Sequence, residues 1–204
     1  MAIDTPARMP ATFKVPVEPI WQLRIEQYHQ MIRTGILTDD DPVELLEGWL
    51  VTKMPKNPSH RLTTQLTCEA LSGLIPAGYY VDDQEPLTTD ESEPEPDVMI
   101  VRGHRRDYRD RHPGPADIAL VVEVSDTTLQ RDRTLKKQIY ARGGIPIYWM
   151  INLPEQQIEC YTDPSGPAEQ PDYQQRRDYP PAEHIPMYIG EQRIGELAVV
   201  DLLP

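Results

Sequence analysis

The chain has 204 residues, of which 39% are apolar and 22 are prolines. This length suits one well-buried domain with proline-rich loops and is short for two. The formal net charge of −13 lowers the expectation of nucleic-acid binding, although basic residues cluster around positions 104–112 and 131–137. No apolar run approaches the ~18 residues that a membrane helix needs.

Targeting and cysteine patterns bear on the compartment. The first residues lack the charged start and the apolar run of a signal peptide. Cys68 and Cys160 have no metal-site spacing, and two free thiols are typical of a reducing compartment. We therefore expect a cytoplasmic protein with no membrane association.

The chain divides into a short arm and a folded part. Residues 1–19 are predicted to form a flexible N-terminal arm, and residues 20–204 a single domain. Apolar residues at three- and four-residue spacing predict a helix over residues 20–34. Gly35 is placed to end this helix, because glycine adopts the left-handed conformation that closes many helices.

A bend and a second helix follow. Residues 43–54 predict a strand pair or a bent strand around Gly48. Ser59 is a favourable N-cap for a helix that runs to about Gly73. The apolar stripe predicted for this helix consists of Leu62, Leu66, Ala70 and Leu74.

The remaining segments predict a sheet. The most apolar run ends at Val124 and is predicted to be a central strand. A helix over residues 129–142 follows it, and the segments after Thr162 predict a β meander. The predicted strands cover residues 79–81, 97–101, 118–124, 145–152 and 157–161. This order predicts an α/β (mixed α+β) fold with a central mixed sheet flanked by helices.

Two acids lie at the ends of apolar strands. Asp97 opens the run DVMIV, and Glu123 lies near the end of IALVVEV. A carboxylate is costly to bury there unless it is paired or binds a cation. With the carbonyl of Val124, the two carboxylates form an oxygen-rich set that suits Mg²⁺ or Mn²⁺. The alternative is that each carboxylate pairs with an arginine or caps a strand end.

Lys136 is the candidate for stabilising negative charge beside Glu123. Asp132, Lys136 and Tyr140 are spaced four apart, so they share one helix face. The alternative is a surface ion pair worth roughly 0.3–0.5 kcal/mol. Lys137, on a neighbouring face, is the second choice.

Upstream groups are candidates to complete the site. Glu44 or Glu47 could ligate a second metal or orient a nucleophile, and His60 lies in the first turn of the second predicted helix. The alternatives are solvent-facing glutamates and a packed or capping histidine. The alternative is favoured for Glu47, and both interpretations stay open for Glu44 and His60.

The segment 121–161, VVEVSDTTLQRDRTLKKQIYARGGIPIYWMINLPEQQIECY, resembles the Uma-type endonucleases of bacteria, which belong to the PD-(D/E)XK nuclease superfamily. The segments VELLEGWLVTKMPKNPSH and EPEPDVMIV and the closing DLL match as well. The resemblance therefore extends from about Tyr28 to the end of the chain.

This resemblance implies a restriction-endonuclease-like core and assigns roles to particular residues. The motif acids fall on Asp97 and Glu123. Ser125 stands where the motif lysine is expected, and the resemblance implies that Lys136 takes over its role. The front-end glutamate maps to Glu44 and the family histidine to His60. Ile147 departs from an acidic residue usual in relatives, at a position expected to form a surface or dimer contact.

The implied function is Mg²⁺- or Mn²⁺-dependent hydrolysis of phosphodiester bonds in DNA by a homodimer. One alternative is a non-catalytic nucleic-acid- or protein-binding module that retains the nuclease fold. The acidic charge of the chain and Ser125 motivate that alternative. Another is a structural homodimer subunit that needs a second protein for activity.

Overall fold

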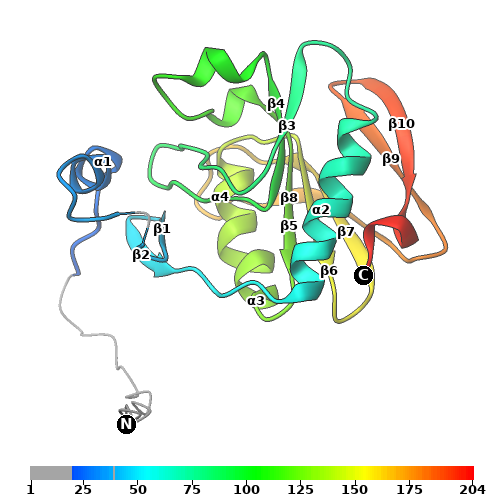
Figure 1. Ribbon diagram of the computed structural model, residues 1–204, viewed down its shortest axis with the longest axis horizontal. Coiled ribbons are helices and arrows are strands. Elements are labelled where there is room, and N and C mark those ends of the chain that lie inside the picture. The colour runs from blue at the N-terminus through cyan, green and yellow to red at the C-terminus, as the bar shows by residue number, and fades with distance from the viewer. Residues whose placement is uncertain (1–19, 39) are drawn as a thin grey trace, which may run out of the picture.

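One mixed sheet organises the protein, whose computed structural model describes residues 20–38 and 40–204 (Figure 1). Its six strands lie in the order β3-β4-β5-β6-β7-β8. The β5–β6 pair is parallel, and the other neighbours are antiparallel. The strands are β3 (Tyr79–Asp82), β4 (Val98–Arg102), β5 (Ile118–Ser125), β6 (Ile147–Asn152), β7 (Gln157–Pro164) and β8 (Tyr173–Tyr179).

The α-helices are α1 (Ile25–Arg33), α2 (Pro58–Ser72), α3 (Leu129–Arg131) and α4 (Lys137–Arg142). Helices α2 and α4 cover opposite faces of the sheet, whereas α1 lies apart from it (Figure 1). A π-helical turn, η3 (Asp132–Lys136), joins α3 to α4, and 3₁₀ turns form η1 (Arg105–Tyr108), η2 (Pro115–Asp117) and η4 (Val199–Leu202). The single helix predicted over residues 129–142 is therefore interrupted by a wider turn.

Alternation along the strands separates two apolar clusters, because successive side chains of a strand point to opposite faces. Val122 and Val124 pack on the face covered by α2, together with Leu71. Val121 packs on the other face with Tyr140 of α4. Glu123 shares the parity of Val121, so the pleat directs its side chain towards α4.

The buried face of α2 differs from the predicted stripe. Leu62 is 45% exposed, whereas Thr63, Thr67 and Leu71 are fully buried. The helix begins two residues earlier than predicted, and Asn57 rather than Ser59 caps it by accepting from the N–H of His60. The buried residues follow His60 at helical spacing, so the face that carries the histidine is the face that lies on the sheet.

Two hairpins flank the sheet. The predicted strand pair is confirmed as β1 (Val43–Leu46) and β2 (Trp49–Thr52), joined through Glu47 and Gly48 at φ 51° and 77°. Positive φ at both positions is typical of a tight hairpin turn. At the other end, β9 (His184–Ile189) pairs with β10 (Gln192–Ala198). The predicted meander is thus divided, because β8 joins the main sheet instead.

None of the helices within residues 20–38 and 40–204 is long and apolar enough to cross a membrane.

A buried ion pair anchors the π-helical turn to the sheet. Glu159 on β7 is fully buried and accepts from the Arg133 side chain, with Nε at 3.0 Å. It also accepts from Asn152 and from the hydroxyl of Tyr161. Burial alone would raise the pKa of Glu159, but the hydrogen bonds from Arg133, Tyr161 and Asn152 lower it below its ordinary value of 4.5.

We expect Glu159→Gln to lower the free energy of unfolding by about 2 kcal/mol at pH 7, because charged hydrogen bonds to a buried acceptor are lost. Since the native pKa is depressed, this difference is fully present above about pH 4.5 and shrinks as the pH falls. Urea denaturation between about pH 3 and pH 8 measures both effects, because the decrease lies below about pH 4.5. Glu155→Gln is the matched control, because Glu155 also contacts Arg133 but is half exposed; a loss as large as that of Glu159→Gln would contradict the account.

Candidate active site

The register of two strands brings the motif acids together. Val98 on β4 lies opposite Val122 on β5 in an antiparallel pair, so Asp97 and Glu123 are the next cross-strand neighbours. The N–H of Val124 donates to Oδ2 of Asp97 at 2.9 Å. Both carboxylates are buried at the same end of the pair.

Glu123 is held by two donors from the helix that follows it. Lys136 Nζ lies 2.9 Å from Oε1 of Glu123, and the hydroxyl of Tyr140 donates to the same oxygen at 2.5 Å. All three side chains are buried. The helix face predicted for Asp132, Lys136 and Tyr140 therefore points into the protein, and a surface ion pair for Lys136 is excluded.

Glu44 reaches the same lysine from the β1–β2 hairpin. Its Oε2 lies 3.2 Å from Lys136 Nζ and accepts from the backbone N–H of Glu95 at 3.2 Å. Arg131 lies 3.7 Å from its other oxygen. The solvent-facing alternative for Glu44 is wrong, because its side chain is almost fully buried. Lys136 thus bridges two glutamates from separate parts of the chain.

His60 orients the other acid. Its Nε2 lies 3.1 Å from Oδ2 of Asp97, and its Nδ1 is buried without a hydrogen-bond partner among the described residues. The N-cap at Asn57 fixes the first turn of α2 and thereby the direction of this ring. His60 therefore contacts the acid cluster, and the capping role belongs to Asn57.

Two of the weighed residues lie elsewhere. Glu47 lies in the β1–β2 turn, where its Oε2 accepts a hydrogen bond from Nη1 of Arg142 at 2.5 Å. The ammonium of Lys137 lies 2.7 Å from Oδ1 of Asp172 and 5.3 Å from the ring centroid of Tyr161. Neither lines the cleft that contains Asp97 and Glu123.

One contributor was missed in the sequence. Asp132 is buried, and its Oδ2 accepts from the hydroxyls of Ser125 and Thr128 at 2.8 and 2.5 Å. Ser125 occupies the position expected for the motif lysine, and its hydroxyl is bound by Asp132 of η3. The spacing of Asp132 from Lys136 was the signal that could have identified it.

The electrostatics of the three central groups differ. Burial disfavours ionised Asp97, but His60 and the Val124 N–H lower its pKa below the ordinary value. Burial raises the pKa of Glu123 to about 8, against the opposing charge of Lys136. Burial alone would lower the pKa of Lys136, but Glu123 and the surrounding carboxylates raise it. Lys136 therefore stays charged, whereas Glu123 holds its proton to higher pH than an exposed glutamate.

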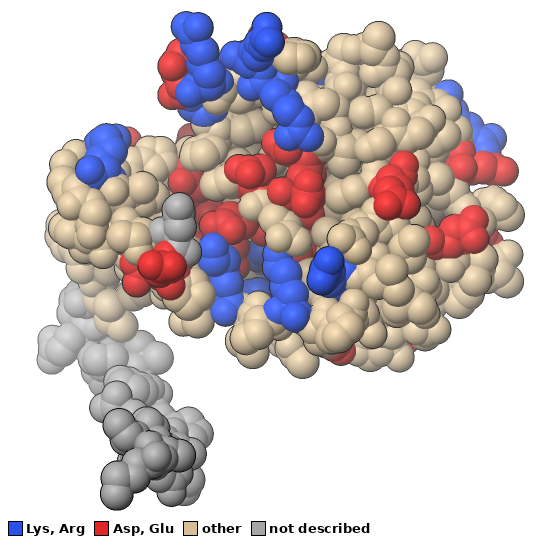
Figure 2. Space-filling model, viewed as in Figure 1, with Lys and Arg blue, Asp and Glu red and all other residues tan. Residues whose placement is uncertain are grey.

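These groups line a cleft with a cavity of about 70 Å³, large enough for a cation and a few waters. Six acidic and four basic side chains face it, so acidic groups outnumber basic ones by two. Figure 2 shows carboxylates gathered in the middle of the visible face, with basic side chains below and above them. The six acidic side chains that line the cleft are Glu44, Glu95, Asp97, Glu123, Asp126 and Asp132, and the four basic ones are Lys53, Lys56, Arg131 and Lys136.

The free oxygens of the cleft fit a divalent cation. Protein donors hold Oδ2 of Asp97 and Oε1 of Glu123, so Oδ1 and Oε2 are the oxygens left for a metal. Val124 lines the same cleft, so its backbone carbonyl is the third candidate oxygen ligand.

The metal would still need water to complete its shell. Over residues 20–38 and 40–204, no three His, Cys, Asp or Glu side chains are grouped as ready-made metal ligands. Mg²⁺ commonly binds through one or two carboxylates and keeps several waters. Two carboxylates and one carbonyl are therefore a sufficient protein contribution.

Comparison with known proteins places the chain in a family. A family model named Uma2, with the description "Putative restriction endonuclease", matches residues 25–190, a span that includes every candidate site residue. The chain belongs to the Uma2 family. No curated protein matches it. Family membership supports a nuclease function in general.

A solved structure has a similar fold. It is the crystal structure of a putative nuclease belonging to DUF820 from Anabaena variabilis ATCC 29413, with a TM-score of 0.61 and 15% sequence identity. The match covers 83% of this chain and 94% of that chain. The predicted mixed α+β fold is confirmed by this likeness and by the central six-stranded sheet.

We expect the metal-free protein to lose stability as the pH rises from 5 to 8. The native pKa of Glu123 lies near 8, above its ordinary value of 4.5, so the native state retains a proton that the unfolded state releases. The contribution is at most about 1.4 kcal/mol per pH unit. Denaturation in EDTA at several pH values should show a smaller slope for Glu123→Gln than for the wild type and for Glu95→Gln; three equal slopes would contradict the assignment.

Proposed function

We propose that this protein is a Mg²⁺- or Mn²⁺-dependent endonuclease that hydrolyses phosphodiester bonds of DNA. The observation that carries the proposal is the convergence of Asp97, Glu123 and Lys136 in one cleft. Two carboxylates with unengaged oxygens lie beside a buried ammonium, which is a combination suited to phosphoryl chemistry. The family description supports the same general reaction class.

A bound divalent cation would polarise the scissile phosphate and acidify an attacking water. Asp97, Glu123 and the Val124 carbonyl are the groups that would hold it. His60 keeps Oδ2 of Asp97 engaged, so that Oδ1 stays directed to the cleft. The pKa of Asp97 is depressed, and this carboxylate is therefore ionised at neutral pH and ready to bind a cation.

Lys136 supplies the positive charge that the missing motif lysine would supply. Its pKa is raised by Glu123 and Glu44 despite burial, so the ammonium keeps its charge at neutral pH. Because its position is fixed by two carboxylates, little reorganisation is needed when negative charge develops on the phosphate. Tyr140 holds the glutamate that holds the lysine, and we assign it a positioning role.

Two observations favour a second candidate, a binding module without catalysis. The described residues contain no ready-made cluster of three metal-ligating side chains, and both glutamates already contact Lys136. Such a module would bind nucleic acid or protein and cut neither DNA nor RNA with any metal. We retain the homodimer as part of the leading proposal, supported by the exposure of Trp21 and Ile36.

Purified protein should convert supercoiled plasmid DNA to nicked or linear forms in Mg²⁺ or Mn²⁺. We expect Asp97→Ala to abolish cleavage and Lys136→Ala to reduce the rate by about 10²–10³-fold, by analogy with the loss of an oxyanion donor. Lys137→Ala is the matched control, because its ammonium pairs with Asp172 away from the cleft.

The outcomes separate the two candidates. Cleavage that persists undiminished in Asp97→Ala would exclude this site. No cleavage of DNA or RNA by the wild type with either metal, together with retained binding, would favour the module. Far-UV circular dichroism of each variant checks that the fold is intact.

A further inference from the structure

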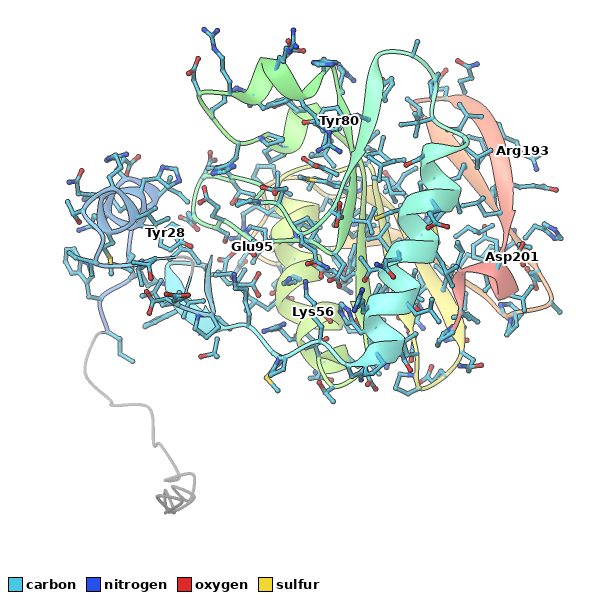
Figure 3. The ribbon with its side chains drawn as sticks, viewed as in Figure 1. Tyr28, Lys56, Tyr80, Glu95, Arg193 and Asp201 are labelled. Atoms are coloured by element: carbon cyan, nitrogen blue, oxygen red, sulfur yellow. The ribbon has the colours of Figure 1, made fainter. Side chains whose placement is uncertain are left out.

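Lys56 is loosely held beside the acid pair. It lies in the connector between β2 and α2, and its side chain is 41% exposed (Figure 3). Its ammonium is 3.7 Å from Oδ1 of Asp97, beyond hydrogen-bond distance. Lys53 in the same connector instead donates to both oxygens of Glu95 at 2.9 Å. Moving the Lys56 ammonium away from Asp97 therefore breaks no hydrogen bond and costs little free energy.

The oxygen that Lys56 faces is the one available for a metal. Oδ2 of Asp97 is occupied by His60 and by the N–H of Val124, which leaves Oδ1 for cations. A divalent cation and the Lys56 ammonium cannot both be close to Oδ1 without strong mutual repulsion. Linkage makes this effect reciprocal: if a bound metal weakens the contact between Lys56 and Asp97, the contact weakens metal binding by the same free energy.

Lys56 also has space into which it can move. It borders the acid cleft and a second hollow of about 480 Å³, which is lined also by Arg61 and Gln65 of α2. The lysine side chain is a flexible four-carbon stem with a compact charge. Its ammonium can therefore leave Asp97 while the connector stays in place, and remain at the edge of the cleft.

We propose that Lys56 exchanges partners during the reaction cycle: it neutralises Asp97 in the metal-free protein, and metal binding displaces it to contact a phosphate of the nucleic-acid substrate. This inference rests on the proposed function, since it requires the metal to bind at Asp97 and a nucleic acid to enter the cleft. Lys56 is then a substrate-positioning residue that also sets the metal affinity. Arg61, which lines the second hollow, supplies a matched charge that does not line the cleft of Asp97 and Glu123.

Calorimetric titration of the full chain with Mn²⁺ alone tests the first half. We expect Lys56→Met to bind Mn²⁺ about tenfold more tightly than the wild type, because a competing cation is removed. Lys56→Arg should retain the wild-type affinity, and Arg61→Met, which removes an equal charge nearby, should leave it unchanged. Equal affinities for Lys56→Met and the wild type would overturn the exchange.

Cleavage kinetics at saturating Mn²⁺ test the second half. Lys56→Met should raise KM about tenfold with little change in kcat, because a phosphate contact used for binding is lost. An unchanged KM would overturn the substrate contact. Absence of Mn²⁺ binding to the wild type would contradict the proposed function as well, whereas tight Mn²⁺ binding that is insensitive to Lys56 would contradict this inference alone.

Discussion

The ion pair of Lys136 with Glu123 and Glu44 is the interaction on which the site depends. Three nearly inaccessible ionisable groups come from the π-helical turn, a central strand and a separate hairpin. Burying charges is costly, and removing one partner of such a set typically costs about 3–5 kcal/mol because the others are left uncompensated. The main effect of the cluster is therefore to fix the position of the hairpin and of the π-helical turn relative to the sheet. Its net contribution to the free energy of unfolding is small by comparison.

The π-helical turn explains how one short segment faces inward with several polar groups. The segment η3 contains five residues, and both its first, Asp132, and its last, Lys136, are buried. Turns of this kind interrupt α-helices frequently at functional sites. Here Asp132 takes up the hydroxyl of Ser125, while Lys136 reaches Glu123. A lysine ammonium therefore reaches Glu123 from the helical segment, while Ser125 stands on the strand.

The acid pair could be predicted because a carboxylate at the end of an apolar strand can be recognised in the sequence itself. Lys136 could be predicted because its spacing placed it on one helix face with Tyr140. The buried face of α2 could not, since Thr63 and Thr67 count as polar although they lie on the sheet below His60. The place of Glu44 depends on how a hairpin docks across the chain, which no local pattern reports. The role proposed for Lys56 depends on which oxygen of Asp97 is free, and this is a property of the folded site alone.

The central claim is that the unengaged oxygens of the acid pair bind a divalent cation. Anomalous diffraction from a crystal of the full chain soaked in Mn²⁺ tests this most directly. The account predicts a single strong peak bound by Oδ1 of Asp97, Oε2 of Glu123 and the Val124 carbonyl, with water at the remaining positions. A peak at another site, or no peak in the cleft at a saturating Mn²⁺ concentration, would contradict it.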